Sequence, residues 1–401
     1  MWTLGIDIAK RTHCAHLLDE QGQTRMEGFV FENSHKGVAA LEAKLLQSQA
    51  PKEALRVGME ATGHYWMVLF EKLCGLGYDV VLLNPLVTSA RRNATIRGAK
   101  TDKIDALHIA RVLREERLPV SAVAQEKVLE LRALTRMRYD LAQQAVAVKL
   151  QLGALLDRAF PEFREHFSDL VGLASTAVLQ ECPTAEHLKK IDVRRLTRLM
   201  HEASKGRCGY DKAKALKAAA KTSFALTSQA ELLGLQIRMV VEQVNLLLRQ
   251  IEEIETHLGT YYEQQQQLLR SIPGIGPVWA PTILAELLPI FDPENERGPR
   301  KFVAMAGLDA QVKESGQSRG KARMSKRGSR YLRTAAIQAA EVAACRAKDP
   351  LFSAVYTTQR ARGKSHNVAL SHVAHKLLHV IFAVLRDKKA YSPNLPSEKK
   401  N

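Results

Sequence analysis

Short runs of apolar residues, separated by polar turns, dominate the first 117 residues of the chain. Runs of this length predict strands, and apolar residues spaced three and four apart predict helices. The expected order is three successive strands, a helix, and a strand–helix–strand unit, over residues 4–9, 13–18, 25–31, 34–46, 55–60, 65–76 and 78–83. The beginning of the chain is therefore expected to be a mixed α/β region.

Beyond this region the periodicity is helical. Apolar residues recur in steps of four and three over residues 141–159, and again without a break over residues 237–261. A repeat sustained for more than three heptads is typical of a coiled coil, although one long bundle helix gives the same pattern. If the two helices pair antiparallel, the helical insert between them, residues 160–226, lies at the far tip of a hairpin. Breaks are expected in it at Pro183 and at residues 206–209.

The last third of the chain combines helices with irregular segments. Residues 271–276 form a glycine-bearing turn that either binds a phosphate backbone through its amides or simply joins two helices. Helices are expected over residues 330–346 and 368–386. The predicted divisions are a metal-binding domain, a helical coiled-coil region, a C-terminal domain and a disordered tail, over residues 1–117, 118–265, 266–388 and 389–401.

These elements predict an α/β plus α fold class. Three meandering strands followed by β-α-β units match the ribonuclease-H-like arrangement. The central region is then a helical coiled coil, and the C-terminal domain is mostly α-helical.

Charge narrows the range of partners. The chain of 401 residues has 59 Lys and Arg against 42 Asp and Glu, a formal charge of +17. Such an excess predicts a polyanionic partner, and nucleic acid is the commonest. A membrane surface is the competing interpretation, but we expect no stretch apolar enough to span a bilayer, and the first residues begin a strand rather than a signal peptide. Five cysteines without a CxxC pair predict reduced thiols in a cytoplasmic protein.

Four acidic residues stand where a metal site would need them. Asp7 interrupts an apolar strand, Glu60 ends another, and Asp102 and Asp105 fall in the first turn of a helix expected over residues 103–113. Acids near a helix start are favourable by themselves. A carboxylate inside a buried strand, however, is costly unless a cation compensates it. Converging carboxylates bind divalent cations, and two such ions can activate a nucleophile against a phosphodiester.

A basic loop precedes the helix that carries two of these acids. It contains Arg91, Arg92, Arg97 and Lys100. The loop could hold a phosphate backbone over the acids, and the simpler interpretation is a solvated loop.

A second basic segment runs from residue 313 to residue 333, with eight basic residues and one acid. Charge of this density gives a salt-dependent affinity for nucleic acid. The segment also holds four serines, but no base lies near them in the sequence to activate a nucleophile. A plain binding loop is therefore the simpler interpretation. The side chains expected to bind nucleic acid here are Lys313, Arg319, Lys321, Arg323, Lys326, Arg327 and Arg330.

Three histidines, His372, His375 and His379, lie near one face of a predicted helix. Their spacing invites a metal interpretation, but the HExxH pattern of metalloproteases is absent. Packing or phosphate contacts are the favoured roles.

Motifs in both halves of the chain resemble those of a known family. They are GIDIAK at residues 5–10, MEATG at 59–63, NP at 84–85, KTDKIDA at 100–106, IPGIG at 272–276, FVAMAGL at 302–308, ESG at 314–316 and MSKRG at 324–328. In this order they resemble the DEDD transposases of bacterial insertion sequences, which are relatives of the Piv DNA invertase and include bridge-RNA-guided serine recombinases. The resemblance covers nearly the whole chain, least of all the insert.

The resemblance implies a RuvC-like first domain, a coiled-coil middle and a C-terminal transposase domain with a nucleophilic serine. By position, Asp7, Glu60, Asp102 and Asp105 would bind Mg²⁺ or Mn²⁺, and Ser315 would be the nucleophile. Only the resemblance selects this serine over its rivals, Ser318, Ser325 and Ser329.

The same resemblance implies the reaction and the partners. Strand exchange would proceed through a covalent phosphoserine bond, in a site shared between subunits of a dimer or tetramer. The partners would be double-stranded DNA, as element ends and target, and a structured non-coding guide RNA. The expected location is the bacterial cytoplasm, in association with the nucleoid. Two alternatives remain: a RuvC-like hydrolytic nuclease such as a junction resolvase, and a non-catalytic nucleic-acid-binding protein.

Overall fold

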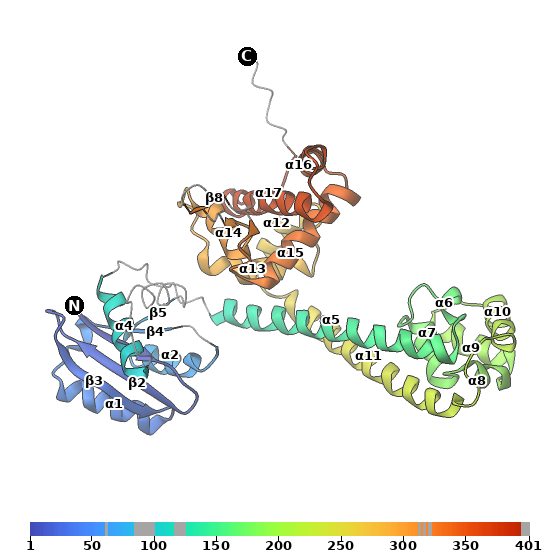
Figure 1. Cartoon of the computed structure of the whole chain (residues 1–401), viewed down its shortest axis with the longest axis horizontal. Coiled ribbons are helices and arrows are strands. Elements are labelled where there is room, and N and C mark those ends of the chain that lie inside the picture. The colour runs from blue at the N-terminus through green and yellow to red at the C-terminus, as the bar shows by residue number, and fades with distance from the viewer. Residues whose placement is uncertain are drawn as a thin grey trace, which may run out of the picture. The chain divides into compact units, whose positions relative to one another are not determined.

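The computed structural model describes residues 1–60, 63–83, 101–115, 126–311, 314–315, 318–319 and 323–393. The chain divides into two compact units, Met1–Ala124 and Gln125–Asn401. In Figure 1 the first unit runs from blue to teal and the second from green to red. The boundary between the central and C-terminal regions, expected after residue 265, stays a prediction.

The first unit is built on a mixed sheet of five strands. The strands are β1 (Trp2–Asp7), β2 (Thr12–Leu18), β3 (Thr24–Glu32), β4 (Leu55–Glu60) and β5 (Asp79–Leu83). They lie in the order β3-β2-β1-β4-β5, with antiparallel pairs among the first three strands and parallel pairs from β1 to β4 to β5. The five predicted strands are confirmed, and their order agrees with a ribonuclease-H-like domain.

Helices cover both faces of this sheet. They are α1 (His35–Gln47), the short 3₁₀ turn η1 (Lys52–Ala54), α2 (Trp66–Gly75) and α4 (Asp102–Glu115). Leu4 and Ile6 of β1 share a buried core with Leu41 of α1 and Leu69 of α2. Helix α4 covers the opposite face. Its backbone can approach β1 closely because Gly5 has no side chain there. All three predicted helices of this unit are present.

Two long helices, α5 (Glu126–Ala159) and α11 (Ala230–Leu258), form an antiparallel hairpin in the second unit. Arg138 of α5 pairs with Glu255 of α11 at 2.7 Å, whereas the amide of Leu226, just before α11, donates to the carbonyl of Arg158 at 2.9 Å. Early residues of one helix therefore meet late residues of the other, as predicted. The supercoiled packing of a coiled coil stays a prediction.

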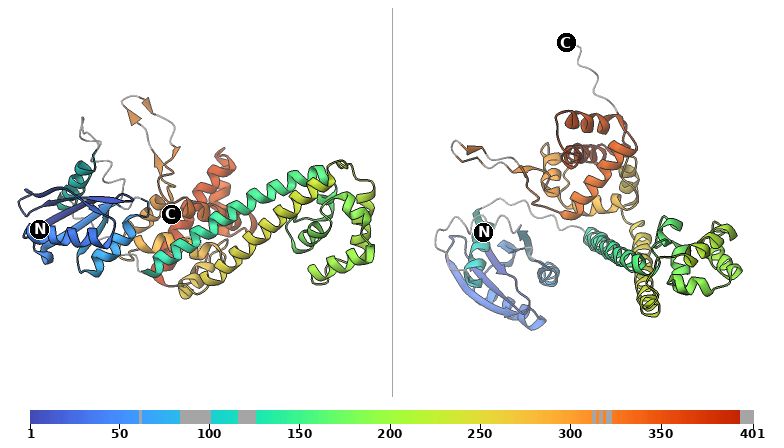
Figure 2. Two further views of the ribbon diagram at one scale, coloured as in Figure 1. Left: turned by 90° about the horizontal axis from the view of Figure 1, so that it is seen from below. Right: turned by 45° about the vertical axis from the view of Figure 1, so that its right-hand side comes forward.

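The insert forms a small helical bundle at the far end of this hairpin, as Figures 1 and 2 show. Its helices are α6 (Phe163–His166), α7 (Leu173–Glu181), α8 (Ala185–Lys190), α9 (Val193–Ala203) and α10 (Tyr210–Lys221). Pro183 falls between α7 and α8, and residues 206–209 fall between α9 and α10, so both predicted breaks are confirmed. Buried Phe160 and Phe163 join this bundle to the end of α5.

The C-terminal part packs short helices around one central helix. The elements are α12 (Glu263–Arg270), α13 (Trp279–Leu287), η2 (Leu288–Ile290), α14 (Gly298–Ala306), α15 (Arg330–Glu341), the π-helical turn η3 (Val342–Arg346), α16 (Pro350–Ala361) and α17 (His366–Asp387). Rings of Phe291, Phe302 and Phe382 meet edge to face or tilted in the core. Helix α16 was not anticipated, and of its residues only Phe352 is buried.

Helix α17 corrects one expectation. By length and composition it is apolar enough to cross a membrane, although no such stretch was expected. More than half of its most apolar stretch, 56%, is buried inside the unit, and Ala374 and Leu377 are fully covered. The burial accounts for its apolar character as that of a core helix.

The last described residues correct a second expectation. Disorder was expected from residue 389, but Tyr391 is held by two hydrogen bonds. Its hydroxyl donates to Asp349 at 3.0 Å, and its amide donates to the hydroxyl of Ser271 at 2.8 Å. Its ring also stacks on Phe352. Burial and the neighbouring carboxylate raise the pKa of Tyr391. Residues 394–401 lie outside the described residues.

Candidate functional site

Two of the candidate metal ligands end neighbouring parallel strands. Gly5 lies opposite Gly58 and Ile6 opposite Met59 in the β1–β4 register, so Asp7 and Glu60 follow side by side as the last residues of the two strands. Since side chains two residues apart point to the same face, both carboxylates lie on the face that α4 covers. The sheet therefore brings together two acids that are 53 positions apart in the sequence.

The direction of α4 places the other two acids at the same end of the sheet. Its last turn is held at the opposite end, where Arg114 donates to the carbonyls of Asp19 at 2.7 Å and Glu20 at 2.6 Å. Its first turn, which carries Asp102 and Asp105, consequently lies toward the ends of β1 and β4. Asp105 is the most buried of the four acids, at 8% exposed.

The surroundings of Cys14 show that Asp7 and Asp102 both lie near its thiol. Cys14 lies directly opposite Asp7 in the β1–β2 register and is 3% exposed. Burial raises the pKa of the Cys14 thiol, and the negative charges of Asp102 and Asp7 raise it further. The thiol is therefore neutral at physiological pH. Sequence reasoning gave Cys14 no role, and only the strand register reveals its place beside the acids.

The donor set fits a divalent metal ion in type. Carboxylate oxygens on one end of one sheet face are the ligands that Mg²⁺ and Mn²⁺ prefer. Within the described residues, no three His, Cys, Asp or Glu side chains are gathered closely enough to hold an ion as they stand. A metal ion would thus have to draw the four carboxylates inward.

The basic loop expected to lie over the acids, with Arg91, Arg92, Arg97 and Lys100, falls outside the described residues. So do Lys313 and Lys321 of the second basic segment. The side chains of Arg319 and Arg323 are likewise not described, although their backbones are.

The second basic segment is a two-stranded ribbon rather than an irregular loop. Its short strands are β6 (Ala310–Gln311), β7 (Glu314–Ser315), β8 (Ser318–Arg319) and β9 (Arg323–Met324). β6 pairs with β9 and β7 with β8, both antiparallel. Figure 2 shows the strands standing out from the helices of the unit. Ser315 lies opposite Ser318 in the β7–β8 register.

Close backbone packing holds the base of the ribbon together. Gly307 ends α14 in the left-handed conformation, with φ of 62°, and a Cβ there would lie 2.8 Å from the carbonyl oxygen of Arg327. A Cβ on Gly328 would lie 2.3 Å from the carbonyl oxygen of Met305. Both glycines of the motifs are therefore required by this close approach of the two ribbon ends.

Two of the rival serines have structural roles at this base. The hydroxyl of Ser325 donates to the carboxylate of Asp309 at 2.5 Å. The hydroxyl of Ser329 caps α15 by accepting from the amide of Leu332 at 3.2 Å. Asp309 was not singled out in the sequence, since its partner is 16 positions away. These contacts leave Ser315 and Ser318 as the serines on the projecting part of the ribbon.

The first residue of α15 fastens the ribbon base to the long helix α5. Arg330 donates to Asp140 of α5 at 3.0 Å and to the hydroxyl of Tyr331 at 2.9 Å. Its guanidinium lies 4.8 Å from the centroid of the Tyr331 ring, which meets Tyr139 edge to face at 5.1 Å. Arg330, expected to bind nucleic acid, is thus already engaged within the unit. Lys326 and Arg327 are exposed.

The three histidines of α17 do not form a metal group among the described residues. The rings of His375 and His379 stack with centroids 4.9 Å apart. Burial lowers the pKa of both, and the neighbouring His372 and His375 lower them further in turn. Both rings are therefore neutral near physiological pH, which agrees with the packing role favoured from the sequence.

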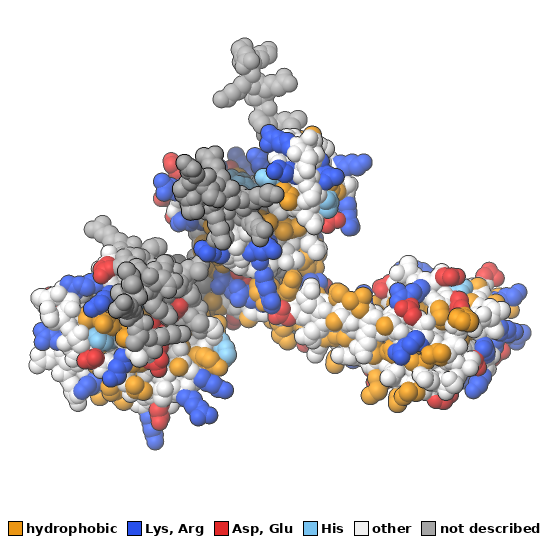
Figure 3. All heavy atoms as spheres, viewed as in Figure 1, with side chains coloured by type: hydrophobic (Ala, Val, Ile, Leu, Met, Phe, Trp, Pro, Cys, Tyr) orange, Lys and Arg blue, Asp and Glu red, His pale blue; other side chains and the backbone are white. Residues whose placement is uncertain are grey.

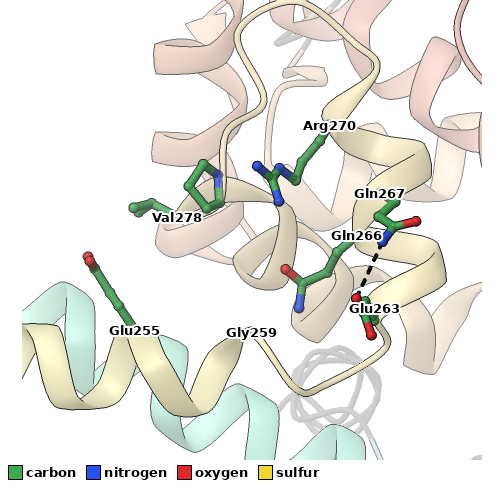
Figure 4. Close-up of a pocket in the computed structure, with 8 residues that line it drawn as sticks. Glu255, Gly259, Glu263, Gln266, Gln267, Arg270 and Val278 are labelled. Atoms are coloured by element: carbon green, nitrogen blue, oxygen red, sulfur yellow. Dashed lines mark hydrogen bonds between the residues drawn. The ribbon is translucent and has the colours of Figure 1, made fainter.

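The glycine-bearing turn at residues 271–276 joins α12 to α13. Gly274 has φ of +89°, and a Cβ there would lie 2.1 Å from the carbonyl oxygen of Ala339. Packing against α15 therefore accounts for this glycine. Beside the turn lies a cavity of about 150 Å³, smaller than the usual pocket for a small-molecule ligand. Figure 4 shows Arg270 and Gln266 of α12 at the cavity, with Glu255 from the end of α11 across from them.

Comparisons with known proteins match both halves of the chain. A transposase family model matches residues 4–161, which include the four acids, and the model of the IS116/IS110/IS902 transposase family matches residues 266–357, which include the ribbon. An uncharacterised 44.8 kDa protein of insertion element IS116 from Streptomyces clavuligerus is 26% identical, over 98% of this chain and 96% of its own.

Two further relatives extend the comparison. An uncharacterised 43.6 kDa protein of insertion element IS110 from Streptomyces coelicolor is 25% identical, over 98% of this chain and 96% of its own. The pilin gene-inverting protein of Moraxella bovis is 28% identical, over 38% of this chain and 46% of its own.

Proposed function

The chain belongs to the IS116/IS110/IS902 family of transposases, and from this premise we propose that it moves an insertion sequence as an RNA-guided serine recombinase. In this proposal, DNA strands are cut and exchanged through a covalent phosphoserine bond, with a divalent metal ion and a guide RNA as partners. The observation that carries the proposal is the placement of Asp7 and Glu60 beside the first turn of α4, together with a serine on a projecting ribbon.

Asp7, Glu60, Asp102 and Asp105 would hold the metal ion in a RuvC-like site. A divalent ion bound there supplies charge that stabilises a phosphodiester under attack. The neutral thiol of Cys14 beside Asp7 adds no further negative charge that such an ion would have to balance.

Ser315 is the proposed nucleophile. Its Oγ forms a bond to phosphorus as the bond from phosphorus to a deoxyribose oxygen breaks, and the serine proton passes to a base while the released deoxyribose oxygen takes one up. Attack by a deoxyribose hydroxyl of the partner strand then reforms a DNA phosphodiester and frees the serine, so no phosphodiester energy is lost. Placement near the end of a two-stranded ribbon suits a residue that must reach DNA held elsewhere.

No local base faces Ser315 in the sequence, and we propose that the acids of another subunit supply the missing partner groups. The protein would then act as a dimer or tetramer. Sequence choice would rest with base pairing to the guide RNA, while the chain's charge of +17 holds phosphate backbones.

The test separates strand exchange from hydrolysis. Purified protein is incubated with its element ends, its flanking RNA and Mg²⁺, and protein joined covalently to DNA is sought on denaturing gels. Ser315→Ala should abolish both cleavage and the adduct, and Ser325→Ala serves as the matched serine control that keeps both. A hydrolytic nuclease would keep cutting after Ser315→Ala. A binding protein would not cut at all, with or without Asp7→Ala.

A further inference from the structure

The helical tip, defined as residues 160–226, contains a long run of positive charge outside the ribbon. From residue 189 to residue 221, eleven of 33 residues are Lys or Arg and three are Asp or Glu. This stretch contributes +8 of the chain's formal charge of +17, and the function proposed above makes no use of it.

Some of these cations are engaged within the tip. Lys189 pairs with Glu186, Arg195 with Glu181, and the Lys212 ammonium lies over the ring of Phe167. Others are exposed and, among the residues that the structure describes, form no ion pair. They are Lys190, Arg194, Arg198, Lys205, Arg207, Lys214 and Lys221.

Five of these side chains, here called the tip face, are exposed on the neighbouring helices α8, α9 and α10: Lys190, Arg194, Arg198, Lys214 and Lys221. The two lysines of α10 are seven positions apart and lie on one side of that helix, with Lys217 between them. Lys217 donates to the carbonyl of Ile191, which joins α8 to α9. That bond brings the lysine stripe of α10 to the end of α8 and the start of α9, where the other members lie.

The acid at the junction of α8 and α9 is used as a helix cap. Asp192 caps α9 by accepting from the amides of Arg194 and Arg195. These backbone hydrogen bonds, helped by the charges of Arg194 and Lys217, lower the pKa of Asp192. Its carboxylate is thus directed at the helix, and the surrounding cations face solvent. Figure 3 shows Lys and Arg side chains along the outer end of the tip.

Cations of this density suit a phosphate backbone, and the proposed substrate, an insertion sequence, is duplex DNA. We propose that the tip face binds the phosphate backbone of duplex DNA, away from the serine ribbon. The choice of DNA as the polymer rests on the proposed function; the presence of a polyanion site rests on the charges alone.

The length of α5 sets the distance between the base of the ribbon and the helical tip. Asp140 of α5 pairs with Arg330 at the ribbon base, and the helix then continues to Ala159 at the tip. At 1.5 Å per residue this stretch is about 28 Å long, which corresponds to roughly 8 base pairs of duplex at 3.4 Å each. The tip face would therefore contact DNA at least that far from the anchored end of the ribbon.

The test measures how affinity for duplex DNA depends on salt. The full chain with Arg198→Gln, Lys214→Gln and Lys221→Gln is compared with the wild type and with a matched triple variant of exposed lysines elsewhere, Lys36→Gln, Lys72→Gln and Lys364→Gln. Each lost phosphate contact reduces the slope of log affinity against log salt by about 0.9. We therefore expect the tip variant to lose roughly 2–3 units of slope, and the control to lose none.

A second variant, Lys190→Gln with Arg194→Gln, must also reduce the slope, which guards against one variant that misfolds. An unchanged slope in both, or an equal loss in the control, would overturn the proposal. So would a loss seen with structured RNA and absent with duplex DNA. Ser315→Ala removes no positive charge and should keep the wild-type slope of log affinity against log salt. A covalent adduct that persists in Ser315→Ala would refute the proposed function, and the tip face would still be supported by the slope measurement.

Discussion

Arg136 of the long helix α5 donates two hydrogen bonds to the carboxylate of Glu286 of α13, from Nε at 2.8 Å and from Nη2 at 3.1 Å. The Glu286 side chain has no exposed surface, and Arg132 adds a second positive charge at 4.0 Å. A buried carboxylate is tolerated only while such partners remain. This pair therefore fixes the angle at which the hairpin leaves the C-terminal helices.

Glu286→Ala should destabilise the second unit by about 2–3 kcal/mol, because two arginines lose the carboxylate that balances them. The measurement is the free energy of unfolding from urea denaturation of the full chain. Glu255→Ala is the matched control: its pair with Arg138 also joins distant segments but is partly exposed, at 39% for the glutamate. Exposed pairs contribute less than about 1 kcal/mol. Equal losses in the two variants would contradict the special role of Glu286.

Asp140→Asn should leave stability nearly unchanged and slow strand exchange. Its pair with Arg330 is half exposed, at 48% and 61%, so the pair contributes less than about 1 kcal/mol. The same pair anchors the ribbon, and a loosened anchor reduces the rate of adduct formation once DNA is bound. The readout is the single-turnover rate at saturating DNA, alongside the affinity. A fall in affinity with an unchanged rate would show that Asp140 does not position the ribbon.

Gly5→Ala should disrupt the acid site through packing alone. The added Cβ would lie 2.1 Å from the carbonyl oxygen of Ala106 and 2.4 Å from the amide nitrogen of Ala110, both backbone atoms of α4 that cannot move aside singly. Overpacking of this kind costs about 1–3 kcal/mol or more. Gly75→Ala, where nothing lies within 4 Å, is the control and should be neutral or slightly stabilising. Thermal melting of both variants checks the contrast, and equal melting temperatures would refute it.

Mn²⁺ should raise the melting temperature of the first unit without any DNA present. A ligand that binds only the folded state stabilises it by about 2.7 kcal/mol at a hundredfold excess over its Kd. Asp7→Asn should remove most of that shift, and Glu53→Gln, an exposed acid elsewhere in the unit, should keep it. The measurement is differential scanning calorimetry with and without chelator. A full shift in Asp7→Asn would separate Asp7 from the metal site.

Acid should destabilise the C-terminal helices through His375 and His379. Burial holds the folded-state pKa of each below the ordinary histidine value of 6.5, so the unfolded chain takes up protons first as the pH falls. Stability is unaffected above that value and declines below it until the folded pKa is passed. His379→Gln should flatten this decline, whereas His35→Gln at the start of α1 should not. Melting temperatures across the pH range from neutral to mildly acidic provide the check.

Sequence patterns predicted the fold well where burial is extensive. The continuous apolar runs of β1 and β2, which are buried on both faces, and the heptad steps of α5 and α11 report directly which side chains are covered. The pattern of apolar residues did not predict α16, where only Phe352 is buried. It also did not predict the fixed position of Tyr391, whose hydroxyl bonds to Asp349, more than 40 positions away in sequence. A polar segment that docks on a distant partner leaves no local pattern.

Some residues of the candidate site could be named from the sequence, and others only from the structure. Asp7 could be singled out from the sequence because a carboxylate in an apolar strand is conspicuous by its cost, and Asp102 and Asp105 gained their interpretation from it. The neighbour Cys14 could not be named, because its position opposite Asp7 depends on the strand register. Arg330 was expected to bind nucleic acid, and its engagement by Asp140 came from packing between α5 and α15.

The order of residues alone therefore determined the elements, the excess of positive charge and the family motifs, since each is written in neighbouring positions. Tertiary structure decided which end of α4 meets β1 and β4, which serines are tied into the ribbon base, and which cations of the tip are exposed on neighbouring helices. Those outcomes depend on pairings across long stretches of chain. Such pairings are selected by the free energy of burying whole surfaces together, and no short window of sequence contains that information.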